Sequence, residues 1–346
     1  MKRWAQMALA VAAMMAAGCS RDERPTLNIF VWSEYISPEV IAGFEREYGC
    51  RVQTDTFDTN ESMYAKLQAG GCQYDILLPS SFFIPVLTAR KLIRPLDTNL
   101  LPHVLSGRDE TYLAPQDPDA AYHVPYAVSS FGLATLRPYA KTVTNRTWHG
   151  LLTNPQFANR TTLFNDVRNT FGAALLSLGL DVNTTNPVDI ARAQARLVEW
   201  QKHILRYDNE EYKGGLCSGE FKLCAAYGTD AVQMQEDNPE VVFIFPEDGW
   251  ILTTDDFAIP GNAQQVALAH AFIDYMYRPE NAVRNMARMG CLCPVKTAYP
   301  LLPEQVRRNP IVFPDKTTIT RGHWLKDVGP ALRLYAQAWD EVRAAD

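Results

Sequence analysis

The amino-acid sequence predicts an α/β fold built from two units of similar size with a cleft between them. Apolar runs of strand length alternate with capped, amphipathic helices from Leu27 almost to the end of the chain. The chain has 346 residues, of which 47% are hydrophobic, and this many alternations exceed what one core accommodates. No repeat or low-complexity segment interrupts the pattern, so both units are expected to be globular.

The first unit opens with the apolar run "LNIFVW", which is typical of a buried strand. Ser37 and Pro38 then begin a helix that Gly49 ends. The next expected elements are the strand "CRVQTDTF", the capped helix "TNESMYAKLQAGG" and the buried strand "YDILLPSS". Because helices join these strands, we expect a parallel sheet whose strand ends carry the ligand-binding loops.

The second unit is expected to begin around residues 127–133. Its predicted elements are the strand 161–166, the helices 169–179 and 187–205, and the strands 222–228 and 241–247. The chain then continues with a helix over 266–290 broken at Pro279 and a last helix over 327–346.

The first 19 residues are typical of a lipoprotein-type signal peptide rather than of folded structure. A short basic segment and an Ala-rich apolar run precede "AAGC", which resembles a lipobox ending at Cys19, the residue to be acylated. Residues 20–26 then form a polar tether, and the lipid holds an extracytoplasmic domain at a membrane. A plain secretory signal is the alternative. No later segment is apolar enough to span a membrane.

Beyond the leader the chain has an even number of cysteines. In an oxidising compartment such cysteines favour pairing as disulfides. They are Cys50, Cys72, Cys217, Cys224, Cys291 and Cys293. Cys217 and Cys224 could close a small loop, and Cys50 and Cys72 could lie on one edge of a sheet. The last two are too close in sequence to pair comfortably with each other. A zinc site is the alternative, but no Cys-x-x-Cys pair supports it.

Charge and motifs exclude several classes of function. Lys and Arg number 33 against 39 acidic residues, and the net charge of −6 argues against nucleic acid or an anionic membrane as a partner. The sequence has no nucleophile elbow, Walker loop, dinucleotide fingerprint or zinc-protease motif, and its six His residues are scattered singly. We therefore predict no enzyme activity, no cofactor and no metal site.

Carboxylates next to aromatic residues recur at the expected strand ends. One such acid is usually a helix cap or a solvated loop residue, but four at comparable points suit a ligand with separated positive charges. The acids are Glu34, Asp166, Asp230 and the Asp255–Asp256 pair. Aromatic faces beside a cation contribute about 0.5–2 kcal/mol each, with ordinary core packing as the alternative. The aromatic candidates are Trp32, Tyr35, Phe82, Phe83 and Tyr227.

Several longer motifs make the chain similar to a known family. They are "FVWSEYISPEV", "TNESMYAKLQAGGCQYDILLPSSFF", "NTTNPVDI", "DDFAIPGNA", "YRPENAV" and "FPDKTTITRGHWLKDVGPALRLY". With them the chain resembles the substrate-binding proteins of spermidine/putrescine ABC transporters almost from end to end. The resemblance implies a two-lobed periplasmic binding protein of type II-like fold, with two crossovers between lobes. It implies lobe one over 27–130 and 255–299, and lobe two over 131–254 and 300–346.

The resemblance also implies a set of ligand-binding residues. These are Trp32, Ser33, Glu34, Tyr35, Ser80, Phe82, Asp166, Tyr227, Asp230 and Asp255. Four positions depart from the family pattern, and they indicate a reshaped aromatic clamp with room for a bulkier amine. The departures are Asn169 for a second acid, Thr253 for an aromatic, Cys291 for a Tyr and Leu325 for a Gln.

The function implied is binding of a cationic amine, with putrescine and spermidine as the leading candidates, and its delivery to an ABC permease. We expect a monomer that contacts the membrane only through its lipid. One alternative is a periplasmic sensor that reports amine occupancy to a membrane signalling partner. An enzyme is the third hypothesis, disfavoured because the sequence has no nucleophile or metal motif.

Overall fold

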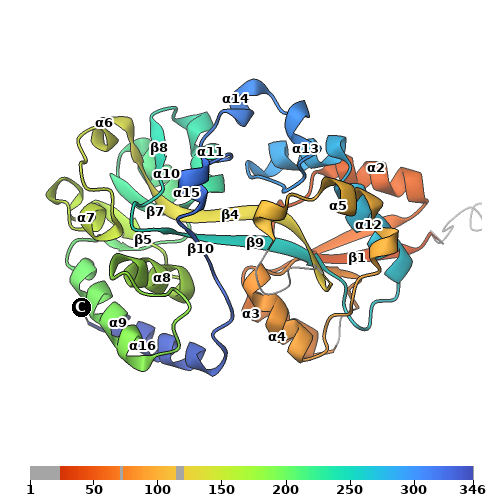
Figure 1. Cartoon of the computed structure of the whole chain (residues 1–346), viewed down its shortest axis with the longest axis horizontal. Coiled ribbons are helices and arrows are strands. Elements are labelled where there is room, and N and C mark those ends of the chain that lie inside the picture. The colour runs from red at the N-terminus through yellow and green to blue at the C-terminus, as the bar shows by residue number, and fades with distance from the viewer. Residues whose placement is uncertain (1–23, 71–72, 114–120, 346) are drawn as a thin grey trace, which may run out of the picture.

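The computed structural model describes residues 24–70, 73–113 and 121–345 of the chain. The predicted signal peptide, Cys19 and most of the predicted tether lie outside the described residues. The described part has two lobes built on one ten-stranded sheet, with helices flanking the sheet in each lobe and long strands running between the lobes across the middle of the molecule (Figure 1). The α/β two-lobed expectation is confirmed.

The sheet of the first lobe is built around β1 (Thr26–Val31). It pairs in parallel with β2 (Arg51–Thr56) and with β3 (Ile76–Leu77), as the helical crossovers predict. The first crossover, α2 (Pro38–Tyr48), has Pro in its first turn and ends at Gly49 with a left-handed backbone. The second, α3 (Asn60–Gln68), begins at a capping box formed by Thr59 and Ser62.

Two long strands belong to both lobes. β4 (His123–Leu136) pairs antiparallel with β9 (Trp250–Ala258), and its C-terminal half pairs with β7 (Leu223–Tyr227) and β8 (Val241–Ile244). The C-terminal end of β9, at Ala258, pairs with β3. The boundary between the two units that the sequence predicts, around residues 127–133, falls inside β4. Both faces of β4 and β9 are largely buried, so neither shows the alternation that marks a half-exposed strand.

The second lobe places β7 between β4 and β5, and its helices cover the sheet. Its elements are α6 (Arg137–Ala140), α7 (Trp148–Leu152), β5 (Thr161–Leu163), α8 (Val167–Ser177), α9 (Pro187–Gln201), β6 (Arg206–Tyr207), α10 (Tyr212–Ser218), α11 (Gly228–Asp237) and α16 (Leu332–Arg343). The remaining short elements are α4 (Ile84–Ala89), α14 (Glu304–Arg307), α15 (Lys316–Ile319) and β10 (Gly322–Trp324), the last of which pairs in parallel with β9.

The hydrophobic core divides into separate clusters. One packs around Trp148 and Trp200 in the second lobe, and another around Phe44 and Phe272 in the first. A smaller cluster around Met63 fills the other face of the first lobe's sheet. Each lobe therefore has a core of its own, which lets the lobes move as units about the strands that join them.

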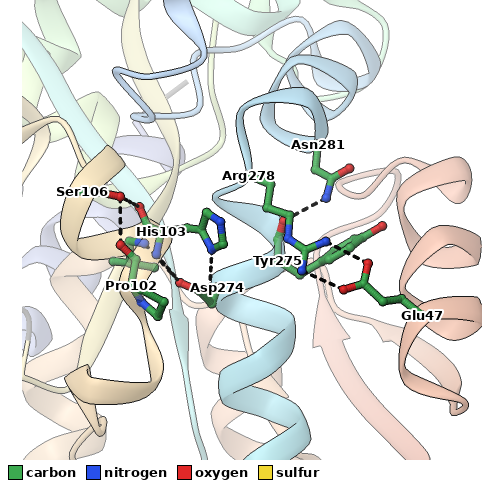
Figure 2. Close-up of polar contacts among 9 residues, drawn as sticks. Glu47, Pro102, His103, Ser106, Asp274, Tyr275, Arg278 and Asn281 are labelled. Carbon is green, nitrogen blue, oxygen red and sulfur yellow. Dashed lines mark hydrogen bonds and ion pairs between the residues drawn. The ribbon is translucent and has the colours of Figure 1, made fainter.

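Hydrogen bonds and ion pairs connect helices of the first lobe to one another (Figure 2). Asp274 of α12 (Val266–Met276) contacts His103 of α5 (Pro102–Gly107) through both of its carboxylate oxygens. Its Oδ1 accepts a hydrogen bond from the backbone N–H of His103 at 2.7 Å, and its Oδ2 lies 2.6 Å from the ring Nδ1. Arg278, between α12 and α13 (Pro279–Met289), donates to both oxygens of Glu47 in α2, at 2.8 and 2.7 Å. The predicted helix break at Pro279 is confirmed.

The five described cysteines are free thiols, namely Cys50, Cys217, Cys224, Cys291 and Cys293. The bridge considered between Cys217 and Cys224 is not formed, because the Cys217 sulfur lies near the carbonyl of Met234 while that of Cys224 lies near the carbonyl of Tyr212. The partner considered for Cys50 lies outside the described residues. Among the residues described, no cluster of His, Cys, Asp or Glu could hold a metal ion.

Candidate ligand-binding cleft between the lobes

A cleft of about 740 Å³ opens between the two lobes, large enough for a small organic ligand. The first lobe lines it with the end of β1, the start of α3 and the loop after β3. The second lobe lines it with the starts of α8, α10 and α11. The predicted site residues found in its wall are Trp32, Ser80, Phe82, Asp166, Tyr227 and Asp230.

Asp255 lies behind this wall in the middle of β9, and only 5% of it is exposed. Its Oδ2 accepts a hydrogen bond from the Tyr35 hydroxyl at 2.5 Å, and its Oδ1 accepts one from Ser80 Oγ at 2.8 Å. Both donors are neutral. Burial raises the pKa of Asp255 to about 6, although the two hydroxyl hydrogen bonds oppose this shift. A cation brought beside this carboxylate would therefore be strongly favoured.

Ser80 is held in place by a side chain of α3. The amide of Asn60 donates from Nδ2 to Ser80 Oγ at 3.2 Å, and its Oδ1 accepts from the Ser80 backbone N–H at 3.0 Å. The Tyr126 hydroxyl in turn donates to the Tyr35 carbonyl at 2.7 Å. The two donors to Asp255 are thus fixed by buried hydrogen bonds, so the carboxylate is oriented before any ligand arrives.

Asp166 combines a capping role with a position in the cleft wall. It is the N-cap of α8, and its Oδ1 accepts from the backbone N–H of Asn169 at 2.7 Å. Burial raises its pKa as well. Asn169 donates from its amide to the Tyr227 hydroxyl at 2.9 Å, which fixes the tyrosine ring against Phe164. Asp166 forms no ion pair in the described part of the chain, although the nearby Arg168 guanidinium lowers its pKa against the larger effect of burial.

Asp230 has a different environment from the other two acids. The Tyr212 hydroxyl donates to its Oδ2, and the Lys213 ammonium lies 3.4 Å from its Oδ1. All three side chains line the cleft. Sequence reasoning did not single out Tyr212 or Lys213, because only the packing of α10 against α11 brings them to Asp230.

Some of the aromatic candidates line the cleft, and one belongs to the hydrophobic core. Trp32 and Phe82 line the cleft on the first lobe, opposite Tyr227 and Phe164 on the second. Phe83, for which the sequence left both interpretations open, is 8% exposed and belongs to a core cluster. Sequence reasoning passed over Phe164, although it stands two residues before Asp166 at the end of β5.

Ser33 and Glu34 do not line the cleft. Glu34 has a left-handed backbone with φ +59°, its side chain is 76% exposed, and it forms an ion pair with Arg288 at 2.9 Å. The turn at Glu34 directs this side chain away from Asp255, while the next residue, Tyr35, reaches it. The sequence motif therefore supplies two residues to the site region, Trp32 and Tyr35, and two to the surface.

Of the four positions where the sequence departs from the family pattern, three lie in the cleft wall, namely Asn169, Thr253 and Leu325. Thr253 Oγ1 is 3.2 Å from Ser81 Oγ, so this small side chain stays close to the sheet. Cys291 is buried and its thiol lies near Asp255 and Met289, outside the lining of the cleft.

Residues 39–314 match the family model of bacterial extracellular solute-binding proteins, which covers most of the chain. The chain belongs to this family. Its curated relatives include the spermidine/putrescine-binding periplasmic protein 1 of Haemophilus influenzae, 29% identical over 92% of this chain and 89% of the relative. They also include a putrescine-binding periplasmic protein of Escherichia coli, 27% identical over 99% of this chain and 98% of the relative.

Solved structures of similar proteins agree with the two-lobed fold of this solute-binding protein. A putative spermidine/putrescine ABC transporter protein of Listeria monocytogenes has a TM-score of 0.85 at 29% identity, covering 93% of this chain and 99% of the other. A lipoprotein of Treponema pallidum has a TM-score of 0.82 at 26% identity, covering 92% and 99%.

Membership of the family settles the broad class of the protein. It is a solute-binding protein rather than an enzyme, as the missing catalytic motifs predicted. The family is extracellular, so the expected extracytoplasmic location is confirmed. No helix within the described ranges is long and apolar enough to cross a membrane.

Proposed function

We propose that this solute-binding protein binds a polyamine of the putrescine or spermidine class in the interlobe cleft and delivers it to an ABC permease. The observation that carries the proposal is that Asp166 and Asp255 lie at the cleft without an ion-pair partner among the described residues, and that the hydrogen-bond donors of Asp255 are two neutral hydroxyls. A buried carboxylate without a counter-ion is costly, and a ligand ammonium removes that cost through a charge-assisted hydrogen bond.

Each wall of the cleft has a role in this proposal. One ammonium lies at Asp255, beside Ser80, and a second at Asp166. Trp32, Phe82 and Tyr227 pack on the methylene groups between them, as the aromatic faces of both lobes allow. Glu34 stays on the surface with Arg288 in this arrangement.

The similar proteins support this ligand class and this partner. The relatives are named for binding spermidine, putrescine or both, and similar structures are titled as spermidine/putrescine ABC transporter proteins. None of these relatives is named as a sensor, so transport is the better-supported role for this chain.

We propose the same domain boundaries that the sequence implied, with lobe one over 27–130 and 255–299 and lobe two over 131–254 and 300–346. The separate core clusters support this division. Ligand closes the lobes by bending β4 and β9, the strands that both lobes share. We also propose that the protein acts as a monomer tethered through a lipid on Cys19.

Calorimetric titration tests the proposal. Protein unfolded and refolded to remove any carried ligand is titrated with putrescine and spermidine, and with 1,4-butanediol as a neutral compound of matched length. We expect heat and a change in tryptophan fluorescence with the amines and neither with the diol. Absence of any response to either amine would overturn the proposal. Mass spectrometry of whatever co-purifies with gently isolated protein gives an independent check.

A further inference from the structure

The three acids of the cleft region differ in what neutralises them. Asp255 takes hydrogen bonds from two neutral hydroxyls, and Asp166 takes one from the backbone of its own helix. Asp230 alone is paired with a cation, the Lys213 ammonium. Among the described residues, Asp166 and Asp255 therefore lack an ion-pair partner, whereas Asp230 has one in Lys213.

The arrangement around Asp230 is complete without a ligand. Tyr212 donates to one carboxylate oxygen and Lys213 faces the other, so both oxygens are engaged. Only 16% of the Asp230 side chain is exposed, whereas Lys213 is 43% exposed and its stem lines the cleft. The Lys213 ammonium stands where a ligand ammonium would have to bind Asp230.

Among the described residues, the neighbouring wall offers no other buried carboxylate for a third ammonium. Asn169 is neutral, and its amide is committed to the Tyr227 hydroxyl. The remaining acids of the lining, Asp58, Glu61 and Glu210, lie exposed at the rim. Water and salt screen exposed charges, so these acids contribute little to holding an ammonium.

We infer that Lys213 is a specificity-determining residue, a built-in counter-ion to Asp230 that makes the cleft prefer ligands with two positive charges. This inference rests on the proposed amine-binding function. A third ammonium at this end would meet the positive charge of Lys213 and a carboxylate that is already neutralised. Diamines should therefore bind more tightly than triamines or tetraamines.

The test compares putrescine and spermidine on wild type and on Lys213→Met, which keeps the length of the side chain and removes its charge. We expect wild type to bind putrescine at least about tenfold more tightly than spermidine, since a tenfold ratio needs only one uncompensated contact. Lys213→Met should reduce that ratio about tenfold or more by raising the affinity for spermidine.

Two control variants make the result specific. Lys66→Met removes another lysine that is paired with an aspartate, Asp55, outside the lining of the cleft, and should leave the ratio unchanged. Lys213→Arg keeps the charge and should keep the preference for putrescine. Circular dichroism and retained putrescine binding report that each variant is folded.

Several results would overturn the inference while leaving the proposed function intact. They are a wild type that binds spermidine as tightly as putrescine, a Lys213→Met ratio within twofold of wild type, or the same shift in Lys213→Arg as in Lys213→Met. A wild type that binds neither amine contradicts the proposed function itself, so the two failures are distinguishable.

Discussion

The hydroxyl of Tyr35 donates a 2.5 Å hydrogen bond to Asp255 Oδ2, although 220 positions of sequence separate the two residues. Tyr35 follows the first strand of the chain, and Asp255 lies in a strand shared by both lobes. Because the donor is neutral, the bond orients the carboxylate without cancelling its charge. A buried, oriented and uncompensated carboxylate is suited to receive a ligand cation.

Amine affinity should depend on pH through Asp255. Burial raises the pKa of this carboxyl from 3.8 to about 6, and only the ionised form attracts an ammonium. We expect affinity to be nearly constant above pH 7 and to fall by at least about tenfold per pH unit below pH 6, because protonation of Asp255 alone links one proton to binding. Calorimetry between pH 5 and pH 8 measures this, and a flat profile would contradict the assignment of Asp255.

Asp255→Asn should abolish amine binding and stabilise the unliganded protein at neutral pH. A folded-state pKa above the unfolded value means that protonation favours folding, so the ionised carboxylate reduces stability as the pH rises through about 6. Removing the charge should raise the free energy of unfolding by up to about 3 kcal/mol at pH 7.5. Urea unfolding without ligand measures the change, and a destabilised variant would show that the carboxylate serves mainly the fold.

The adjacent residue should behave in the opposite way. Asp256 and His123 are both fully buried and contact each other through Oδ2 and Nδ1. Breaking a buried pair by removing one partner usually costs about 3–5 kcal/mol. Asp256→Asn should therefore lower the free energy of unfolding by an amount in that range. The matched control is Asp255→Asn, and equal effects of the two variants would contradict the distinction.

Asp166 and Glu34 should differ in their effect on binding. Asp166→Asn keeps an N-cap side chain for α8 but removes a cleft charge, so amine affinity should fall by about tenfold to a hundredfold. Glu34→Gln removes an exposed charge that Arg288 already pairs, and affinity should change less than about threefold. Calorimetry on both variants measures the two losses of amine affinity. A larger loss in Glu34→Gln than in Asp166→Asn would contradict the prediction.

Trp32 should report ligand binding by its fluorescence. Among the described tryptophans it alone lines the cleft. Saturating putrescine should therefore change the emission of wild type, and Trp32→Phe should lose most of that change while retaining binding by calorimetry. A full fluorescence response in Trp32→Phe would place the ligand elsewhere or assign the signal to lobe closure.

Local patterns in the sequence were sufficient for much of the fold. The helix that starts at Pro38 and ends at Gly49 follows from local preferences for Pro at the first turn and for Gly in the left-handed conformation. The break at Pro279 has the same local origin. The parallel pairing of the first strands follows from their helical crossovers. Each of these features depends on residues that are neighbours in the chain.

The sequence alone also predicted Glu34, Asp166, Asp230 and Asp255 as acids near a ligand, and the structure places the last three at the cleft and Glu34 on the surface. The sequence could not distinguish their electrostatic states, because those depend on residues far away in the chain. Tyr35 and Ser80 leave Asp255 without a counter-ion, whereas Lys213 supplies one to Asp230. Adjacent strand residues point to opposite faces, so Asp255 faces the cleft wall while Asp256 faces His123. Residue type and spacing thus determined which groups are present, and only the tertiary structure decided which charges remain uncompensated, since compensation is set by distance in space.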